Sequence, residues 1–214
     1  MRWWEQQIGG ATRGRLIGLI RRGVHTIEEL AGALRLTDNA VRAHIQTLEK
    51  AGVVHAAGTR QRSGPGKPAT VYRIGPTAEP MLSSAYAPVL VAVLETLANR
   101  FSPDAMDDIL RESGKRVASA ERASVGADAA LELRVRAAAA VLTALGAEID
   151  VERTKDGFQL RGHACPLSAA VGATPSSCHV MEELVASLVG APVRECCDRR
   201  DGARCRFDVL ERSA

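Results

Sequence analysis

In the first half of the chain, apolar residues repeat at helical spacing in three short segments, about 12–22, 26–34 and 38–50. Thr26 begins the second segment and Glu29 follows three positions later, which is the spacing of a capping box. In the third segment the apolar positions recur at intervals of four and three, at Val41, Ile45 and Leu48. The pattern predicts three short amphipathic helices that bury one common core.

The spacing of the apolar residues changes after these helices. Two short apolar runs, at 53–54 and 71–74, flank a glycine- and proline-rich segment at 58–68. Apolar runs of this length on either side of such a segment are typical of two strands joined by a turn. The pattern therefore predicts a β-hairpin with a long, basic tip.

The second half begins after Pro76 and returns first to helical spacing. A wide apolar stripe over 82–97 predicts a helix of about five turns. Another helix is expected to start at Ser102, where a proline follows, and two more are expected over 129–145 and 181–189.

Strand patterns complete the second half. Apolar residues alternate on both sides of a Lys-Asp-Gly turn at 155–157, which predicts a hairpin. Two closing strands are expected near 193–198 and 203–210. The fold class expected for the whole chain is therefore α+β.

Composition and charge narrow the choice of protein class. The 214 residues are 46 % apolar and 25 % charged, so the chain can form packed cores, and its length suits two small domains. Residues 1–75 carry twelve Lys and Arg against five Asp and Glu, whereas residues 76–214 carry sixteen against twenty. This division predicts a basic module that contacts a polyanion, joined to a module that does not.

Several classes of protein are not expected. No stretch approaches the ~18 apolar residues of a membrane span, and the first residues lack the apolar run of a signal peptide. We therefore expect no membrane partner and a cytoplasmic location, where thiols stay reduced. The sequence has no Ser/His/Asp order, P-loop or paired acid–base motif, so an enzyme is not expected either.

The third predicted helix has the chemistry of base recognition on its outer face. Its core positions leave four residues outside, near its start: Asn39, Arg42, Ala43 and Gln46. Asn and Gln can pair with adenine, and Arg with guanine. The hairpin adds three basic residues suited to phosphate contacts, namely Arg60, Arg62 and Lys67. Helices followed by a basic hairpin predict a winged helix-turn-helix; a solvated basic face is the alternative.

The same residues carry a family resemblance. The segments 26–31 (TIEELA), 40–45 (AVRAHI) and 48–54 (LEKAGVV), with the wing sequence GPGKP at 64–68, resemble ArsR/DeoR-type winged-helix regulators. They are most similar to the branch that includes the iron–sulfur repressors of cluster-assembly (Suf) operons. The resemblance implies a homodimer that binds double-stranded DNA at a palindromic operator.

Three segments are expected on this basis. Residues 1–76 would form the winged helix-turn-helix DNA-binding domain, 77–123 a helical dimerisation segment, and 124–214 a C-terminal α/β sensor domain. The apolar face of 82–97 is wider than one small domain needs, which favours a dimer interface. Covering the core of its own subunit is the alternative.

The cysteines are concentrated in the C-terminal segment, at positions 165, 178, 196, 197 and 205. They lack the close C-x₂₋₄-C pair of structural zinc sites, and widely spaced thiolates favour an iron–sulfur cluster. Neighbours on a regular strand point to opposite faces, so Cys196 and Cys197 should not share one centre. Alternation puts Cys197, Glu195 and Cys205 on the inward face. Burial as small apolar residues is the alternative for these cysteines.

The predicted metal ligands are therefore Cys165, Cys178, Cys197 and Cys205. Cys196 replaces Cys197 if the hairpin contains a bulge. Three further residues are weaker candidates, as ligands or as hydrogen-bonding neighbours of the ligands: His163, His179 and Glu195.

The cysteine segment extends the resemblance. Residues 163–167 (HACPL) resemble the N-C-P-F/Y segment of the iron–sulfur repressor branch, and the twelve residues between Cys165 and Cys178 match its first ligand spacing. The stretch from Cys197 to Cys205, followed by Arg-Phe, resembles the closing hairpin of vinyl-reductase-type sensor domains. The later spacings differ from the Suf repressors, which leaves the fourth ligand and the cluster type, 4Fe–4S or 2Fe–2S, open.

The function predicted from the sequence is a transcription regulator of the repressor type. Its operator binding would be controlled by an iron–sulfur cluster held by the C-terminal cysteines. The alternative is a winged-helix regulator that senses a small organic ligand or zinc, with the cysteines in a structural role.

Overall fold

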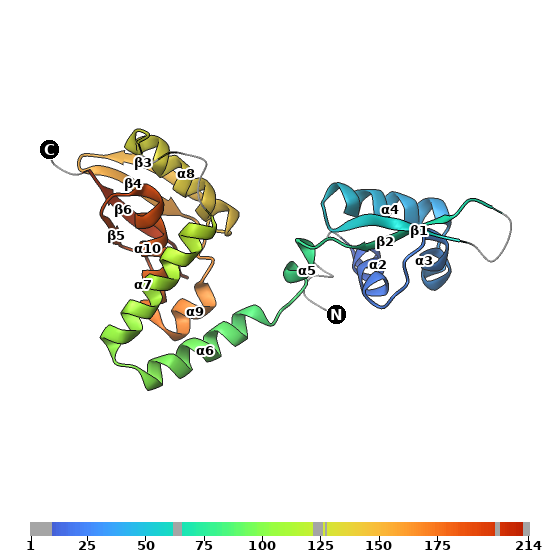
Figure 1. The fold of residues 1–214 in the computed structure, drawn as a ribbon, viewed down its shortest axis with the longest axis horizontal. Coiled ribbons are helices and arrows are strands. Elements are labelled where there is room, and N and C mark those ends of the chain that lie inside the picture. The colour runs from blue at the N-terminus through green and yellow to red at the C-terminus, as the bar shows by residue number, and fades with distance from the viewer. Residues whose placement is uncertain (1–9, 62–65, 122–125, 127, 200–201, 212–214) are drawn as a thin grey trace. The chain divides into compact units, whose positions relative to one another are not determined.

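The computed structural model describes residues 10–61, 66–121, 126, 128–199 and 202–211, and its fold is of the α+β class (Figure 1). The chain forms two compact units, Met1–Ala85 and Tyr86–Ala214. The boundary between the units divides the segment 77–123, because its first residues belong to the first unit and the rest to the second. No helix in the described part of the chain is long and apolar enough to cross a membrane.

The first unit consists of helices followed by an antiparallel hairpin. Its elements are α2 (Ala11–Arg21), α3 (Ile27–Leu34), α4 (Asp38–Lys50), β1 (Val54–Arg60), β2 (Ala69–Ile74) and the short α5 (Ala78–Met81). The strands pair antiparallel, with an irregularity between Ala56 and Thr59. The tip of the hairpin at 62–65 is outside the described residues.

Side-chain caps define where α3 and α4 begin. The Thr26 hydroxyl accepts a hydrogen bond from Glu29 N at 3.2 Å, and the Glu29 carboxylate accepts one from Thr26 N at 2.9 Å. This reciprocal pair is the capping box that the sequence predicts for α3. Thr37 caps α4 in the same way, by accepting from Ala40 N at 3.3 Å.

The core of the first unit comes from the apolar stripes of α2, α3 and α4. Its fully buried members include Leu16, Ile17, Leu30, Val41, Ile45 and Leu48. The hairpin joins this core through Val54 and Tyr72, and the Tyr72 N–H donates to the carbonyl of His25 at 2.9 Å. The hairpin is thus fixed at its base, beside the start of α3.

The second unit packs helices on an antiparallel sheet. Its elements are α6 (Tyr86–Arg100), α7 (Pro103–Ala120), α8 (Leu131–Ala144), β3 (Ile149–Thr154), β4 (Gly157–Gly162), α9 (Ser168–Ala173), η1 (Pro175–Ser177), α10 (Cys178–Val189), β5 (Val193–Glu195) and β6 (Arg206–Leu210). The strand order is β3-β4-β6-β5. Helices α8 and α10 cover one face of the sheet, and their buried side chains meet Leu160 and Phe207 there (Figure 1).

The predicted helix over 82–97 is wrong at its first turn. The structure ends α5 at Met81 and starts α6 at Tyr86, while Leu82 packs in the core of the first unit. Pro88 explains the later start, because proline is tolerated only in the first turn of a helix.

The closing strands are shorter than predicted. The first, β5, ends at Glu195 instead of 198, and β6 starts at Arg206 instead of 203. Between them, Asp198 and Arg204 form only an isolated bridge. The regular alternation expected at Cys196 and Cys197 therefore does not apply, since both follow the end of the strand.

Gly114 lets α7 and α10 approach closely. A Cβ at Gly114 would lie 2.4 Å from the carbonyl oxygen of Val180 and 2.9 Å from the Cβ of Glu183. We expect Gly114→Ala to lower the free energy of unfolding by about 1–3 kcal/mol, because the helices must separate. Urea denaturation measures this loss. The matched control is Gly172→Ala in α9, where an added Cβ meets no atom within 4 Å and stability should not fall.

Candidate functional site

Four cysteines from separate segments of the second unit come together. Cys165 lies in the loop after β4, Cys178 is the first residue of α10, Cys197 follows β5, and Cys205 precedes β6. Cys178 and Cys205 are buried, and the other two are half-buried. Each thiol shifts the pKa of the next one in the order Cys178, Cys197, Cys205, Cys165, so neighbours in this order lie close to each other. The structure thus places the four predicted ligands in one region, but among the described residues only Cys178 and Cys197, together with Glu195, have ligand atoms mutually within 4.8 Å.

Interactions between the thiols lower the pKa of one of them and raise the pKa values of the other three. The hydrogen bond that Cys165 accepts from Cys205 lowers the pKa of Cys165, and the same bond raises the pKa of Cys205 to about 12. The bond from Cys178 lowers the pKa of Cys197, but its bond to Cys205 and its burial outweigh this and raise that pKa to about 12. The pKa of Cys178 is also raised, by its bond to Cys197 and by burial. A bound metal would displace these protons.

Backbone N–H groups point at two of the sulfur atoms. The Arg206 N–H donates to Cys197 Sγ at 3.2 Å, and the Leu167 N–H donates to the Cys165 sulfur. Such donors stabilise negative charge on thiolates and tune metal–thiolate centres. These donors favour the thiolate form, which is reflected in the lowered pKa of Cys165, whereas the pKa of Cys197 stays raised by its contact with Cys205 and by burial.

Cys196 lies apart from the four thiols. Its thiol donates to the Arg206 carbonyl at 3.5 Å and contacts the carboxylate of Asp208. Burial, followed by the charge of Asp208, raises its pKa. Asp208 lies on β6 between the buried Phe207 and Val209, so its side chain is on the opposite face of the sheet from theirs. Cys196 and Cys197 thus occupy different sides of the hairpin although no regular strand continues through them.

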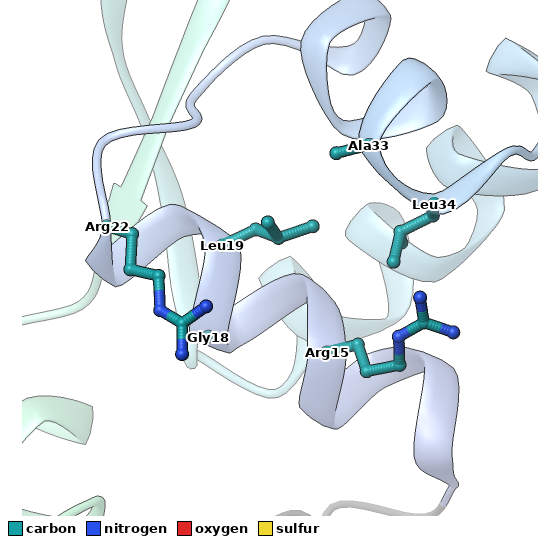
Figure 2. Close-up of a pocket in the computed structure, with 6 residues that line it drawn as sticks. All are labelled: Arg15, Gly18, Leu19, Arg22, Ala33 and Leu34. Carbon is teal, nitrogen blue, oxygen red and sulfur yellow. The ribbon is translucent and has the colours of Figure 1, made fainter.

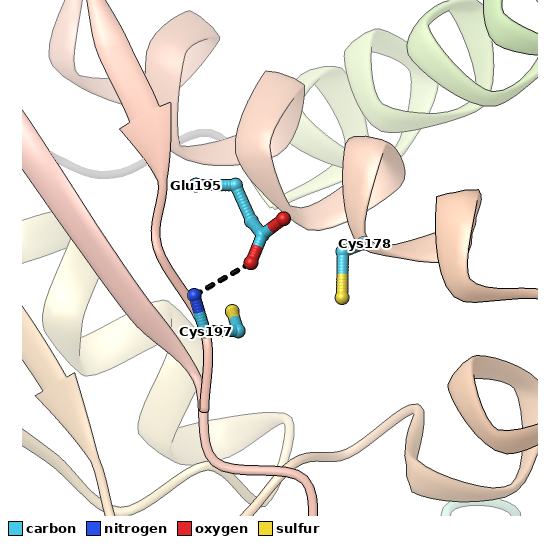
Figure 3. A group of neighbouring side chains, drawn as sticks. All are labelled: Cys178, Glu195 and Cys197. Carbon is cyan, nitrogen blue, oxygen red and sulfur yellow. Dashed lines mark hydrogen bonds between the residues drawn. The ribbon is translucent and has the colours of Figure 1, made fainter. Parts of the chain in front are cut away.

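Glu195 joins the thiol group as a carboxylate. Its side-chain oxygen and the sulfur atoms of Cys178 and Cys197 all lie within 4.8 Å of one another (Figure 3). Glu195 accepts a hydrogen bond from Cys197 N at 2.6 Å and forms an ion pair with Arg199 at 2.9 Å. Burial raises the pKa of Glu195, but hydrogen bonds from Cys197 and Arg199 outweigh it and lower the pKa overall.

Arg199 is a member of the site that sequence reasoning missed. Its guanidinium bonds to the Cys178 thiol as well as to Glu195, and the Cys178 bond is the main cause that raises the pKa of Arg199. No local pattern marks this residue, because the contact joins the start of α10 to the loop after β5.

The two histidine candidates bind carboxylates instead. The ring of His163 bonds to Asp150 at 2.7 Å, and the ring of His179 bonds to Asp107 on α7. Among the described residues, the group with metal-ligand spacing consists of Cys178, Glu195 and Cys197, so it contains neither histidine and also leaves out Cys165 and Cys205. A structural role is therefore the simpler interpretation of both rings.

The donor set fits a thiolate-bound metal centre. Four soft sulfur ligands are the chemistry preferred by iron–sulfur clusters and zinc. In addition, the buried hydroxyl of Ser177, the residue before Cys178, has no hydrogen-bond partner among the described residues. At the same time, Cys205 belongs to the hydrophobic core of the second unit, and Cys165 and Cys197 pack against it, as the alternative of buried apolar cysteines also predicts.

In the first unit, the predicted base-reading residues lie on one exposed helix. Asn39, Arg42, Ala43 and Gln46 are all exposed on α4, while Val41 and Ile45 are buried. Arg42 and Lys67 line a common cavity of about 350 Å³ between α3, α4 and the hairpin, and the acidic Glu28 and Asp38 line it as well. The outward face of α4 thus takes no part in packing the core of the unit, and it lies next to the base of the hairpin.

The other hairpin residues have different surroundings. Arg60 forms an ion pair with Glu29 at 2.6 Å, so part of its charge is neutralised within the unit. Arg62 lies outside the described residues. A further basic hollow of about 230 Å³ lies between α2 and α3, where Arg15 and Arg22 flank Leu19 (Figure 2).

No protein-family model matches the chain, and no curated protein matches it either. The function of both candidate sites is therefore inferred from the chemistry and geometry of the residues that form them. These are the thiol group with Glu195 and Arg199 in the second unit, and the exposed face of α4 with the hairpin base in the first.

Proposed function

We propose that this protein is a DNA-binding transcription regulator of the repressor type, controlled by an iron–sulfur cluster bound to Cys165, Cys178, Cys197 and Cys205. The observation that carries the proposal is that these four thiols come from four separate segments and lie close enough to shift one another's pKa values in pairs, with Cys178 and Cys197 at metal-ligand spacing. When bound, the cluster would supply redox chemistry and sensitivity to oxidants. The role proposed is regulatory, not catalytic, and the reduced thiols suit the cytoplasm.

The first unit would act as a winged helix-turn-helix. In this arrangement α4 enters the major groove of double-stranded DNA, where Asn39, Arg42 and Gln46 can reach base edges. Lys67, Arg62 and the partly neutralised Arg60 would contact phosphates. The exposure of this face of α4 and the basic charge of the first half support the proposal.

Dimerisation would occur through α6. This helix exposes Tyr86, Val89, Leu90 and Val93, of which Val89 is 58 % and Val93 48 % exposed, while Leu94 packs inward. A helix face this apolar is suited to a second copy of the chain, and a two-fold dimer matches a palindromic operator.

Arg42→Ala is expected to weaken binding to the preferred DNA sequence by about ten- to a hundredfold, the loss of one good base contact. Its matched control is Lys50→Ala, which removes the same charge from the exposed end of α4 and should weaken binding less. Fluorescence anisotropy on a sequence selected from random DNA measures both affinities. An equal effect of the two substitutions would argue against base reading by Arg42.

The test of the whole proposal is metal analysis under nitrogen combined with DNA binding. Iron and acid-labile sulfide in the purified protein, with absorbance near 400 nm, are the expected results. The holo and cluster-free proteins should then differ in affinity for the selected DNA. Equal affinity of the two forms would overturn the switching role of the cluster.

A second candidate is a regulator whose thiols hold one zinc ion. The short separations favour it, because tetrahedral zinc holds sulfur atoms about 3.8 Å apart at a Zn–S distance of about 2.3 Å, and the Cys178, Glu195 and Cys197 ligand atoms lie within 4.8 Å of one another. One zinc ion per chain without sulfide would support this candidate. Protein with neither metal nor sulfide would support a sensor of a small organic ligand.

A further inference from the structure

The carboxylate of Glu195 has no role in a centre built on four thiolates. Its side chain is only 16 % exposed, yet it lies among thiols instead of turning to solvent. A charged group in such a place is costly unless it is paired or bound to a metal. Arg199 provides one partner, and the backbone N–H of Cys197 provides another.

Glu195 nevertheless retains capacity to bind a metal ion. An ionised carboxylate has about four lone-pair positions; Arg199 and Cys197 N use two of them, and the Cys197 thiol, whose proton a metal ion would displace, interacts with the same carboxylate. Figure 3 shows the carboxylate on the side of Cys197 that faces Cys178. Its oxygen and both sulfur atoms are mutually within 4.8 Å, so a small shift would bring them around one ion.

The charges of these groups also fit a single divalent ion. Two thiolates and one carboxylate supply three negative charges. A divalent cation together with the Arg199 guanidinium, which contacts both Glu195 and Cys178, would balance them. A mixed sulfur and oxygen donor set suits a cation of borderline softness such as Zn²⁺.

We propose that, in the cluster-free chain, Glu195 joins Cys178 and Cys197 as a ligand of one divalent cation of the Zn²⁺ type. The proposal rests on the proposed function only in that both use the same thiols. It gives the protein a second metal-bound state, in which the carboxylate replaces thiolates that the cluster would engage.

The experiment uses the full-length, reduced, metal-free protein and Co²⁺ as a spectroscopic probe, followed by displacement with Zn²⁺. The wild-type chain should bind one Co²⁺ with thiolate charge-transfer absorbance. Glu195→Gln keeps an oxygen for the Cys197 N–H but loses the charged ligand, so its affinity should fall at least about tenfold. Cys196→Ser, whose thiol lies on the Asp208 side, should bind like wild type.

A second substitution guards against a loss caused by misfolding. Glu195→Cys replaces the carboxylate by a thiolate at the same position, and should retain Co²⁺ binding with stronger thiolate absorbance. Wild-type affinity and spectrum in Glu195→Gln would overturn the proposal. Loss of binding in Glu195→Cys, in protein with an unchanged melting temperature, would overturn it as well.

Reconstitution with iron and sulfide separates this proposal from the proposed function. If the wild-type chain binds Co²⁺ through Glu195 but takes up no iron and sulfide, the cluster is refuted and the Glu195 site stands. If the wild-type chain assembles the cluster while Glu195→Gln binds Co²⁺ unchanged, the cluster stands and the Glu195 site is refuted.

Discussion

Cys197→Ser protein reconstituted under nitrogen is expected to contain only background iron and sulfide, whereas Cys196→Ser protein keeps both. Cys197 is central in the chain of thiols, because it contacts both Cys178 and Cys205. A serine hydroxyl at this position does not ionise at neutral pH and so cannot replace the thiolate. Both thiols donate to the Arg206 carbonyl, but the neighbouring Cys196 contacts Asp208 and, among the described residues, none of the other thiols, so its thiol is not needed.

The two substitutions form a matched pair, because they remove the same atom from adjacent residues. The measurement is iron, sulfide and visible absorbance per chain, with the melting temperature of the cluster-free proteins as the control for folding. Retention of the cluster in Cys197→Ser together with its loss in Cys196→Ser would reverse the assignment of the ligand.

The double substitution Val89→Glu and Val93→Glu is expected to convert the protein into a monomer. Both side chains are about half exposed on α6, so the changes add charge to a surface without disturbing the core residue Leu94. A monomer engages one half of a palindrome at a time. Loss of the second attachment should lower operator affinity by about a hundredfold or more.

Sedimentation velocity gives the oligomeric state, and mobility shift on a palindromic site gives the affinity. Glu95→Ala, on the same helix but outside the apolar set, is the control and should remain dimeric. A double variant that still sediments as a dimer would exclude α6 as the interface.

Local patterns predicted the first unit well, for a physical reason. The apolar stripes of α3 and α4 and the capping box at Thr26 act within three or four residues, so spacing alone reveals them. By contrast, the start of α10 was predicted at 181, although the structure begins it at Cys178. Its first residues include Cys178 and His179, whose contacts are with distant segments instead of with their own helix face.

The thiol group shows where sequence reasoning ends. Strand alternation favoured Cys197 over Cys196, and the structure separates the two residues in that sense, but β5 stops before both. Both thiols contact Arg206 on β6, but only Cys196 contacts Asp208, a difference that spacing does not reveal. The approach of Arg199 to Cys178 is likewise a contact between distant segments.

The close contact at Gly114 couples the positions of helices α7 and α10. At Gly114 the backbone of α7 lies directly against α10, so no side chain of this residue can change rotamer to absorb a shift between the helices. Arg111 on α7 adds ion pairs to Glu182 and Glu183 on α10. We therefore expect a displacement of Cys178, the first residue of α10, to move α7 as well. A change at this sulfur atom would then alter the position of a second helix.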